Sequence, residues 1–292
     1  MSQLLLLGVD AGGTRCRARL ADAAGRVLAE GHGGPANLLS DPTGAWSSIE
    51  RAIAGALDSA GLTGASPDRI AAVMGLAGLD PARPQAPADW PLARFQACRV
   101  ETDAYVAQVG AFGGGDGAIL IVGTGSVGLL VLRGQQTSVG GYGAAVSDEG
   151  SGAWIGLEAV RRALWAFDRR RPGSHMTAQV LAAVGSPPIT QAWANAARPA
   201  DFAALAPLVV AAAEAGDRQA ADILEEAACH LDRILARLAD AGARQVVLAG
   251  GLAEALRPRL KTEALEFVEP QGAALDGALR LAQGLMETQH DG

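Results

Sequence analysis

The sequence has 292 residues, of which 49% are hydrophobic and 19% charged, and it carries a formal net charge of −7 with a pI near 5.1. This length predicts two domains, and the composition is typical of a globular rather than a disordered chain. The acidic balance argues against nucleic acid as a partner, because nucleic-acid binding needs a basic surface.

The cysteines and the apolar stretches indicate the compartment. Cys16, Cys98 and Cys229 are scattered and odd in number, which argues against a disulfide framework or a cysteine metal site and fits a reducing cytoplasm. The N-terminal apolar run is short and lacks a basic segment, so we expect no signal peptide. The apolar stretch at 202–213 is shorter than the roughly 20 residues of a membrane span. We therefore expect a cytoplasmic protein without a membrane partner.

The chain begins with a predicted strand, turn and strand. The apolar run 4–10 reads as a buried strand that ends in Asp10, and 16–20 alternates like a half-exposed strand. Gly12 and Gly13 in the turn would let the backbone approach an anion closely, and the Thr14 hydroxyl could join them around a phosphate.

The next segments predict a β-helix-β order, which is typical of a parallel sheet. Residues 27–30 read as a strand, 43–60 as a helix, 69–75 as a strand and 98–103 as another strand. Asn37, in a Gly/Pro loop, either serves a turn or binds a ligand. Asp103, at a strand end, either caps the helix predicted over 104–112 or acts as a catalytic base.

A second glycine turn lies near the middle of the chain. Gly123, Gly125 and Gly128 fit the dinucleotide-binding spacing G-x-G-x-x-G, but that motif requires a helix after the loop. Residues 129–132 are strand formers instead, so 123–126 should lie at the tip of a β-hairpin. Two such turns in one chain indicate phosphate binding more strongly than either does alone.

The second half is predicted to be largely helical from residue 178 to residue 289. Helices are expected over 153–167, 217–241, 252–256 and 273–286, and a strand over 244–249 leads into Gly250 and Gly251. Asp148 and Glu149 precede the first of these helices, where the helix dipole favours acidic residues in any case.

Taken together, these motifs resemble one family. Residues 10–14 and 123–126 are similar to the two phosphate motifs of the actin-like ATPase and sugar kinase superfamily, and 246–251 resembles its adenosine motif. The resemblance narrows to the N-acetylglucosamine kinase branch with its BadF/BadG/BcrA/BcrD-type ATPases because of Asn37 and the segments 102–104, 140–143 and 148–151. Bacterial glucosamine kinases are similar along nearly the whole chain.

The resemblance implies an α/β fold of two actin-like (ribonuclease H-like) domains with a central cleft. The first would span 1–103, with the C-terminal helix 272–292 packed back on it, and the second 104–271. The implied activity is ATP-dependent phosphorylation of the 6-hydroxyl of glucosamine or N-acetylglucosamine, with Mg²⁺, in a possible homodimer. An ATPase that activates a reductase and a sugar-responsive regulator are the alternatives. The first would need iron–sulfur cysteines that the sequence lacks, and the second an N-terminal DNA-binding extension.

The resemblance also implies the role of each motif residue. Asp103 would be the catalytic base, and Asp10 would hold Mg²⁺ through water. The residues implied to bind the sugar are Asn37, Asp103, Gly141, Tyr142, Gly143 and Asp148. Those implied to bind ATP are Gly12, Gly13, Thr14, Gly123, Thr124, Gly125, Ser126, Gly250 and Gly251.

Overall fold

The computed structural model describes residues 4–80, 82 and 84–287, and the chain divides into two compact α/β units. Unit 1 combines Met1–Ile119, Val131–Gln135 and Glu269–Gly292, and unit 2 combines Leu120–Leu130 and Gln136–Val268. Helix α2 (Asp103–Ala111), expected in the second domain, contacts α10 (Ala274–Glu287) and therefore groups with unit 1. The domain boundary that the resemblance implies, after residue 103, stays a prediction.

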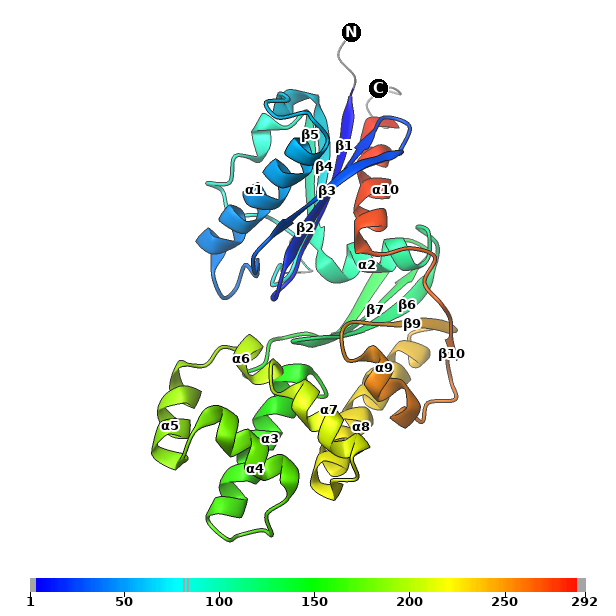
Figure 1. Cartoon of the computed structure of the whole chain (residues 1–292). Coiled ribbons are helices and arrows are strands. Elements are labelled where there is room, and N and C mark those ends of the chain that lie inside the picture. Colours follow the sequence, from blue (N-terminus) through cyan, green and yellow to red (C-terminus); the bar gives the residue numbers. More distant parts are fainter. Residues whose placement is uncertain (1–3, 81, 83, 288–292) are drawn as a thin grey trace. The chain divides into compact units, whose positions relative to one another are not determined.

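Unit 1 is built on a five-stranded sheet with the order β3-β2-β1-β4-β5 (Figure 1). The strands are β1 (Leu5–Ala11), β2 (Cys16–Asp22), β3 (Val27–Gly33), β4 (Ile70–Leu76) and β5 (Ala97–Thr102). β1 pairs antiparallel with β2 and parallel with β4, which in turn pairs parallel with β5. Because β1, β4 and β5 are parallel, their carboxyl ends meet at one edge of the sheet. The predicted β-helix-β order is thereby confirmed.

Alternate residues of β1 enter two different cores. Leu5, Leu7 and Val9 pack on one face with residues of α1 (Pro42–Ser59), whereas Leu6 packs on the opposite face with residues of α10. A strand covered on both faces reads as a continuous apolar run, which is what the first strand of this sequence shows.

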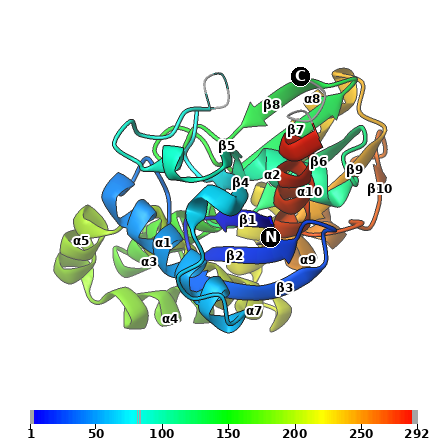
Figure 2. The ribbon, with the colours of Figure 1, turned by 90° about the horizontal axis from the view of Figure 1, so that it is seen from above.

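Helices α2 and α10 lie side by side on the second face of this sheet (Figures 1 and 2). Glycine permits their close approach, since a Cβ at Gly277 would collide with the carbonyl oxygen of Val106 and one at Gly110 with that of Ala273. The helix α10 thus packs within unit 1, and the return of the whole segment 272–292 to a first domain of residues 1–103 stays a prediction. Residues 288 and 289 of the predicted helical region lie outside the described residues.

The second sheet has the order β10-β9-β6-β7-β8. Its strands are β6 (Gly117–Val122), β7 (Ser126–Leu132), β8 (Gln135–Gly140), β9 (Gln245–Ala249) and β10 (Glu266–Phe267). β7 follows the glycine turn directly, so the hairpin prediction is confirmed and the dinucleotide-binding alternative is wrong. β8 and β10 were not predicted, because β8 has no apolar alternation and β10 has two residues.

The helices of unit 2 are α3 (Gly152–Phe167), α4 (His175–Val184), α5 (Pro187–Ala196), α6 (Pro199–Ala203), α7 (Ala206–Glu214), α8 (Arg218–Asp240) and α9 (Ala253–Leu256). Three of them, α3, α8 and α9, follow their predicted bounds to within one residue at each end, and the other four lie mostly in the region that was predicted only as largely helical. α8 packs on β7, where a Cβ at Gly128 would contact Ile234 and Leu238. Within the described chain no single helix is long and apolar enough to cross a membrane, and one pair, 199–214 with 218–240, passes that test only as two segments bent by 117°.

Candidate active site

Three predicted site residues meet at the carboxyl edge of the sheet in unit 1. Asp10 lies near the end of β1, and Asp103 follows β5. Asn37 reaches the same edge because it forms a parallel bridge with Ala77, which directly follows β4. Ligands of open parallel sheets bind at this edge. The fold therefore brings together Asp10, Asn37 and Asp103, which are far apart in sequence.

The first glycine turn lies at this edge and is shaped by its own backbone. The N–H of Gly12 donates to the carbonyl of Arg15 at 3.0 Å, and the carbonyl of Gly12 accepts from Ala36. A Cβ at Gly13 would meet only the amide nitrogen of Asn37, at 3.9 Å. Thr14 and Arg15 are exposed at the tip. The space beside Gly13 is thus open to a ligand, as a phosphate turn requires.

Asp10 is engaged by a neighbouring strand. Its Oδ2 accepts from Nη2 of Arg17 at 2.7 Å, and Arg17 is its register partner across the β1–β2 pair. Among the described residues there is no cluster of three or more His, Cys, Asp or Glu side chains that could hold a metal ion. A Mg²⁺ ion that arrives with nucleotide needs only one or two carboxylates, since phosphates and water complete its shell. The donor set around Asp10 fits that kind of site.

Asn37 fills the turn role, and its ligand-binding role stays a prediction. Its Oδ1 accepts from the N–H groups of Leu39 (2.9 Å) and Ser40 (3.3 Å), which is the turn role. The other end of the amide, Nδ2, faces the space beside Gly13. The turn fixes the side chain, and the amide can donate to a ligand.

Asp103 is not the cap of its helix. The hydroxyl of Thr102 caps α2 by accepting from the N–H of Tyr105 at 3.1 Å, so the capping role belongs to the preceding residue. Oδ1 of Asp103 accepts from the N–H of Ala104 at 2.9 Å. Burial raises the pKa of Asp103 to about 6. The negative charge of Asp10 also raises this pKa, whereas the hydrogen bond from Ala104 lowers it. A carboxylate with such a pKa is a stronger base than an exposed one and is still ionised at neutral pH.

The second glycine turn, in unit 2, is tied to the start of α3. The first amides of this helix region, Gly152 and Ala153, donate to the carbonyls of Gly123 and Thr124 at 2.8 and 3.1 Å. Ser126 is buried, and its hydroxyl donates to the carbonyl of Glu149 at 2.9 Å. The Ser126 hydroxyl therefore holds the turn in place, and a nucleotide would be met by the backbone of the turn and by Thr124.

The predicted adenosine motif lies against this same turn. Gly250 has φ +99°, and a Cβ there would collide with the carbonyl oxygen of Val122, the last residue of β6. The N–H of Leu252 donates to that carbonyl at 3.1 Å. Unit 2 thus places the exposed glycines Gly250 and Gly251 beside the entrance to the 123–126 turn.

Asp148 connects the glycine turn with the 140–143 loop. Its Oδ1 accepts from the N–H of Gly143 at 3.3 Å, and its Oδ2 would lie 2.6 Å from a Cβ at Gly125. Burial raises its pKa, against hydrogen bonds from Gly143 and Ser126, and the charge of Glu149 raises it further. Its φ is +61°, a left-handed conformation that costs a residue with a side chain roughly 1 kcal/mol or more.

The neighbourhood of Asp148 includes the predicted sugar wall. Gly141 and Gly143 have φ of +78° and +94°, which glycine adopts without strain, and Tyr142 between them is 76% exposed. The N-cap of α3 is Ser151, which accepts from Trp154, so Asp148 has no capping role there. A partly buried carboxylate held in a left-handed backbone conformation is a feature that clusters at binding sites.

Each unit therefore gathers its own half of the predicted residues. Unit 1 contains Asp10, residues 12–14, Asn37 and Asp103. Unit 2 contains residues 123–126, residues 141–143, Asp148 and residues 250–251. Sequence reasoning missed Arg17, although a basic residue on the strand that returns from a phosphate turn was a readable signal.

Comparisons with known proteins agree with these motifs. The model of the BadF/BadG/BcrA/BcrD ATPase family matches residues 7–282. The glucosamine kinase GspK of Vibrio cholerae is 34% identical over 281 residues, which cover 94% of this chain and 95% of that protein. A solved structure from Chromobacterium violaceum, proposed to be an N-acetylglucosamine kinase, is 36% identical, covers 97% of this chain and 100% of its own, and superposes with a TM-score of 0.85. A ROK-family glucokinase from Streptomyces griseus shares the fold, with 21% identity, coverage of 96% and 98%, and a TM-score of 0.58.

Proposed function

We propose, from the premise that this chain belongs to the BadF/BadG/BcrA/BcrD ATPase family, that it is an ATP-dependent kinase of amino hexoses that forms the 6-phosphate. Its relatives act on glucosamine in one case and are assigned to N-acetylglucosamine in another. The two sugars make opposite demands. A 2-ammonium group would favour the acidic pair Asp148 and Glu149, whereas an acetamide would favour an apolar surface such as Tyr142.

One observation carries the choice of a phosphoryl transferase. Asp103, with its raised pKa, lies at the same sheet edge as Asp10, Asn37 and the open turn at Gly13. A kinase of this type needs a carboxylate that receives the proton of the attacking hydroxyl, beside groups that hold phosphate. The edge supplies both.

The residues then have distinct roles in the reaction. The 6-hydroxyl oxygen attacks the γ-phosphorus, the bond from that phosphorus to the β,γ-bridging oxygen breaks, and the hydroxyl proton passes to Asp103 while ADP leaves. Asn37 and Asp148 would bind sugar hydroxyls. The phosphate oxygens would be held by the backbone at 12–13 and 123–125 and by the hydroxyls of Thr14 and Thr124. The adenosine would lie against Gly250 and Gly251.

Mg²⁺ belongs to the proposal as well. Asp10 would hold the ion through water, and the ion would neutralise charge on the phosphates. Arg17 donates from Nη2 to Oδ2 of Asp10 and so keeps this carboxylate in place.

The experiment that tests the proposal identifies the product. The purified chain is incubated with ATP, Mg²⁺ and either glucosamine or N-acetylglucosamine, and the products are examined by ³¹P and ¹³C NMR. We expect ADP in equal amount to a hexose 6-phosphate. ADP without sugar phosphate, or phosphate at another hydroxyl, would contradict the proposal.

We also propose a compartment and an oligomeric state for this chain. Cys16, Cys98 and Cys229 are free thiols, which supports a cytoplasmic location.

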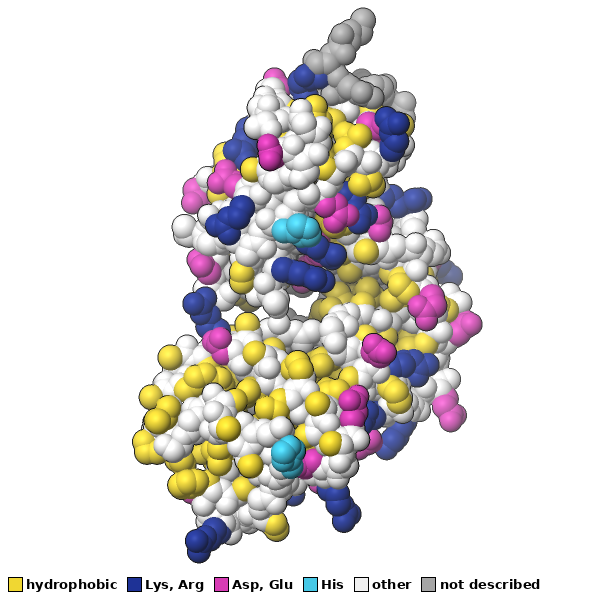
Figure 3. All heavy atoms as spheres, in the orientation of Figure 1, with side chains coloured by type: hydrophobic (Ala, Val, Ile, Leu, Met, Phe, Trp, Pro, Cys, Tyr) yellow, Lys and Arg dark blue, Asp and Glu magenta, His cyan; other side chains and the backbone are white. Residues whose placement is uncertain are grey.

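The region around α5 is nearly free of charge. Only Arg198 and Asp201 are charged between residues 176 and 213. Hydrophobic side chains gather over α5 in Figure 3, and Ile189 is 61% exposed. In a symmetric dimer of a chain with net charge −7, an uncharged face can meet its own copy without repulsion. We propose a homodimer through this face, which sedimentation at micromolar concentration would reveal.

A further inference from the structure

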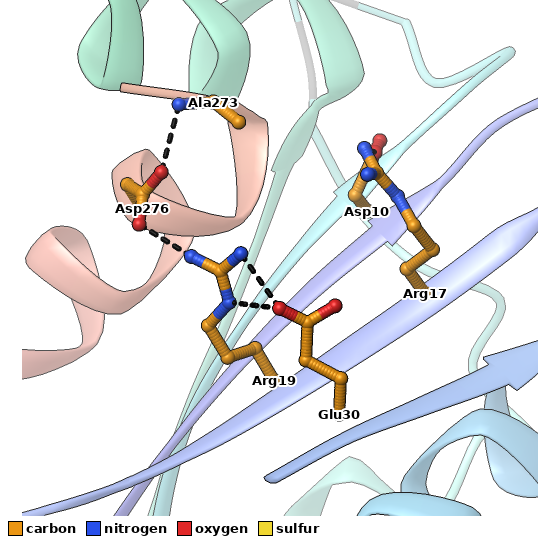
Figure 4. A network of polar contacts seen from close by, with 6 residues as sticks. All are labelled: Asp10, Arg17, Arg19, Glu30, Ala273 and Asp276. Atoms are coloured by element: carbon orange, nitrogen blue, oxygen red, sulfur yellow. Dashed lines mark hydrogen bonds and ion pairs between the residues drawn. The ribbon is translucent and has the colours of Figure 1, made fainter. Parts of the chain in front are cut away.

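Arg17 has an unused hydrogen-bond donor beside the first glycine turn. It lies on β2, one residue after Cys16 where the strand leaves the turn, and its Nη2 donates to Asp10 at 2.7 Å (Figure 4). Its Nε is buried and has no hydrogen-bond partner within the described part of the chain. A buried guanidinium N–H without a partner costs free energy comparable to a lost hydrogen bond to a charged group.

Arg19, two residues further along the same strand, shows the contrast. Its Nε and Nη2 both donate to Oε1 of Glu30, at 2.8 and 2.7 Å, and its Nη1 pairs with Asp276. Figure 4 shows Arg19 between these two carboxylates, and Asp276 is itself held by the N–H of Ala273 at 2.8 Å. The two arginines share a strand face, yet only the one at the glycine turn keeps a buried donor unpaired.

Nε of Arg162 and Nε of Arg259 are also buried and without a hydrogen-bond partner among the described residues, so an unpaired donor alone does not indicate a ligand; that of Arg17 points to one because it lies beside the glycine turn and Asp10. A guanidinium presents its N–H groups in a planar fork that matches the oxygens of carboxylate and phosphate. One arm of the Arg17 fork is taken by the carboxylate of Asp10. The side chain is 25% exposed as a whole, but Nε itself is buried, so the guanidinium has to shift for a ligand to reach the Nε–H.

We propose that Arg17 binds an oxygen of the nucleotide polyphosphate through Nε–H, while its Nη2 holds Asp10. This inference rests on the proposed function, because it takes a nucleotide at the turn as given. A nucleotide phosphate fits better than the sugar, because Arg17 is the second residue of the strand that leaves the glycine turn, whereas a sugar offers no anionic oxygen. Arg17 is then a binding residue that also positions Asp10.

The test measures nucleotide binding by calorimetry with the full chain, for Arg17→Gln and for the matched control Arg19→Gln. ADP and adenosine are each titrated, in EDTA and again with Mg²⁺. We expect Arg17→Gln to weaken ADP binding about 10- to 100-fold, both in EDTA and with Mg²⁺, and to leave adenosine binding unchanged. Arg19→Gln should bind ADP as the wild type does, because its partners are Glu30 and Asp276.

A second variant covers the case in which Arg17→Gln does not fold. Arg17→Lys keeps the positive charge and a reach toward Asp10 but lacks the Nε–H fork, and should weaken ADP binding by a smaller factor.

Several results would overturn the inference. The first is ADP binding that is unchanged in the Arg17 variants. The second is a loss of ADP binding seen only with Mg²⁺, which would mean that Arg17 acts solely through Asp10. The third is a loss of adenosine binding equal to the loss of ADP binding. A wild-type chain that binds no ADP would overturn the proposed function together with this inference, whereas a wild type that binds ADP beside unaffected Arg17 variants refutes the inference alone.

Discussion

Replacing Asp103 by Asn should have opposite effects on activity and on stability. The substitution keeps the size of the side chain and removes the base. Loss of a general base lowers the rate by roughly 10²–10⁴, which corresponds to about 3 to 5 kcal/mol in the barrier. The folded pKa is about 6 against an ordinary 3.8, so the ionised carboxylate destabilises the fold above pH 6 by up to about 3 kcal/mol, less where water screens it.

The sign of the stability effect follows from the raised pKa. The folded chain binds the Asp103 proton more tightly than the unfolded chain, so the stability that this proton contributes is complete below about pH 4 and is lost as the pH rises through about 6. Asn stays neutral throughout. Asp103→Asn should therefore be more stable than the wild type at pH 8, and the difference should shrink toward pH 4.

The assay combines urea unfolding at both pH values with kcat/KM of the wild type from pH 5 to 8. We expect wild-type kcat/KM to rise with pH up to an apparent pKa near 6, because the base must be ionised. Thr102→Ala is the matched control, and it should lose roughly 1 kcal/mol of stability with its cap and keep its activity. A flat pH profile, or an Asp103→Asn variant that turns over at near wild-type rate, would refute the assignment of Asp103 as base.

The other predictions concern ligand placement and packing. Thr124→Val should raise the ATP KM and lower kcat, whereas Asn37→Ala should mainly raise the sugar KM, and steady-state kinetics with the reverse pattern would show that the ligands are misplaced. Gly277→Ala should lower the free energy of unfolding by about 1–3 kcal/mol, because the new Cβ collides with the carbonyl of Val106. Gly284→Ala, in the same helix and with open space around it, is the control and should be neutral or slightly stabilising in the same urea experiment. Equal stability of these two glycine variants would contradict the described packing of α2 and α10.

Much of the fold was predictable because local signals agree with the tertiary structure. The run that became β1 is apolar throughout, since both of its faces are covered, and the glycines at 123–128 pointed to a hairpin because strand formers follow them. β8 (Gln135–Gly140) was missed because its residues are exposed or half-buried, so no apolar alternation marks it. No local pattern distinguishes such a strand from a loop.

The motifs predict a set of candidate site residues, but they do not predict the contacts that these residues make. That Thr102 caps α2, and thereby leaves Asp103 available, depends on a backbone turn that the sequence does not fix. The hydroxyl of Ser126 and the strained backbone of Asp148 are likewise determined by tertiary packing around α3. Arg17 was missed because its meaning depends on the register that sets it opposite Asp10.

The central claim, an amino-sugar kinase, is tested most directly by comparing kcat/KM for glucose, mannose, glucosamine and N-acetylglucosamine at a fixed concentration of ATP. A site built to bind a 2-substituent through polar groups rejects a sugar that leaves those groups unpaired. We predict that at least one of the two amino sugars gives a higher kcat/KM than glucose. Glucose as the best substrate of the four would contradict the account.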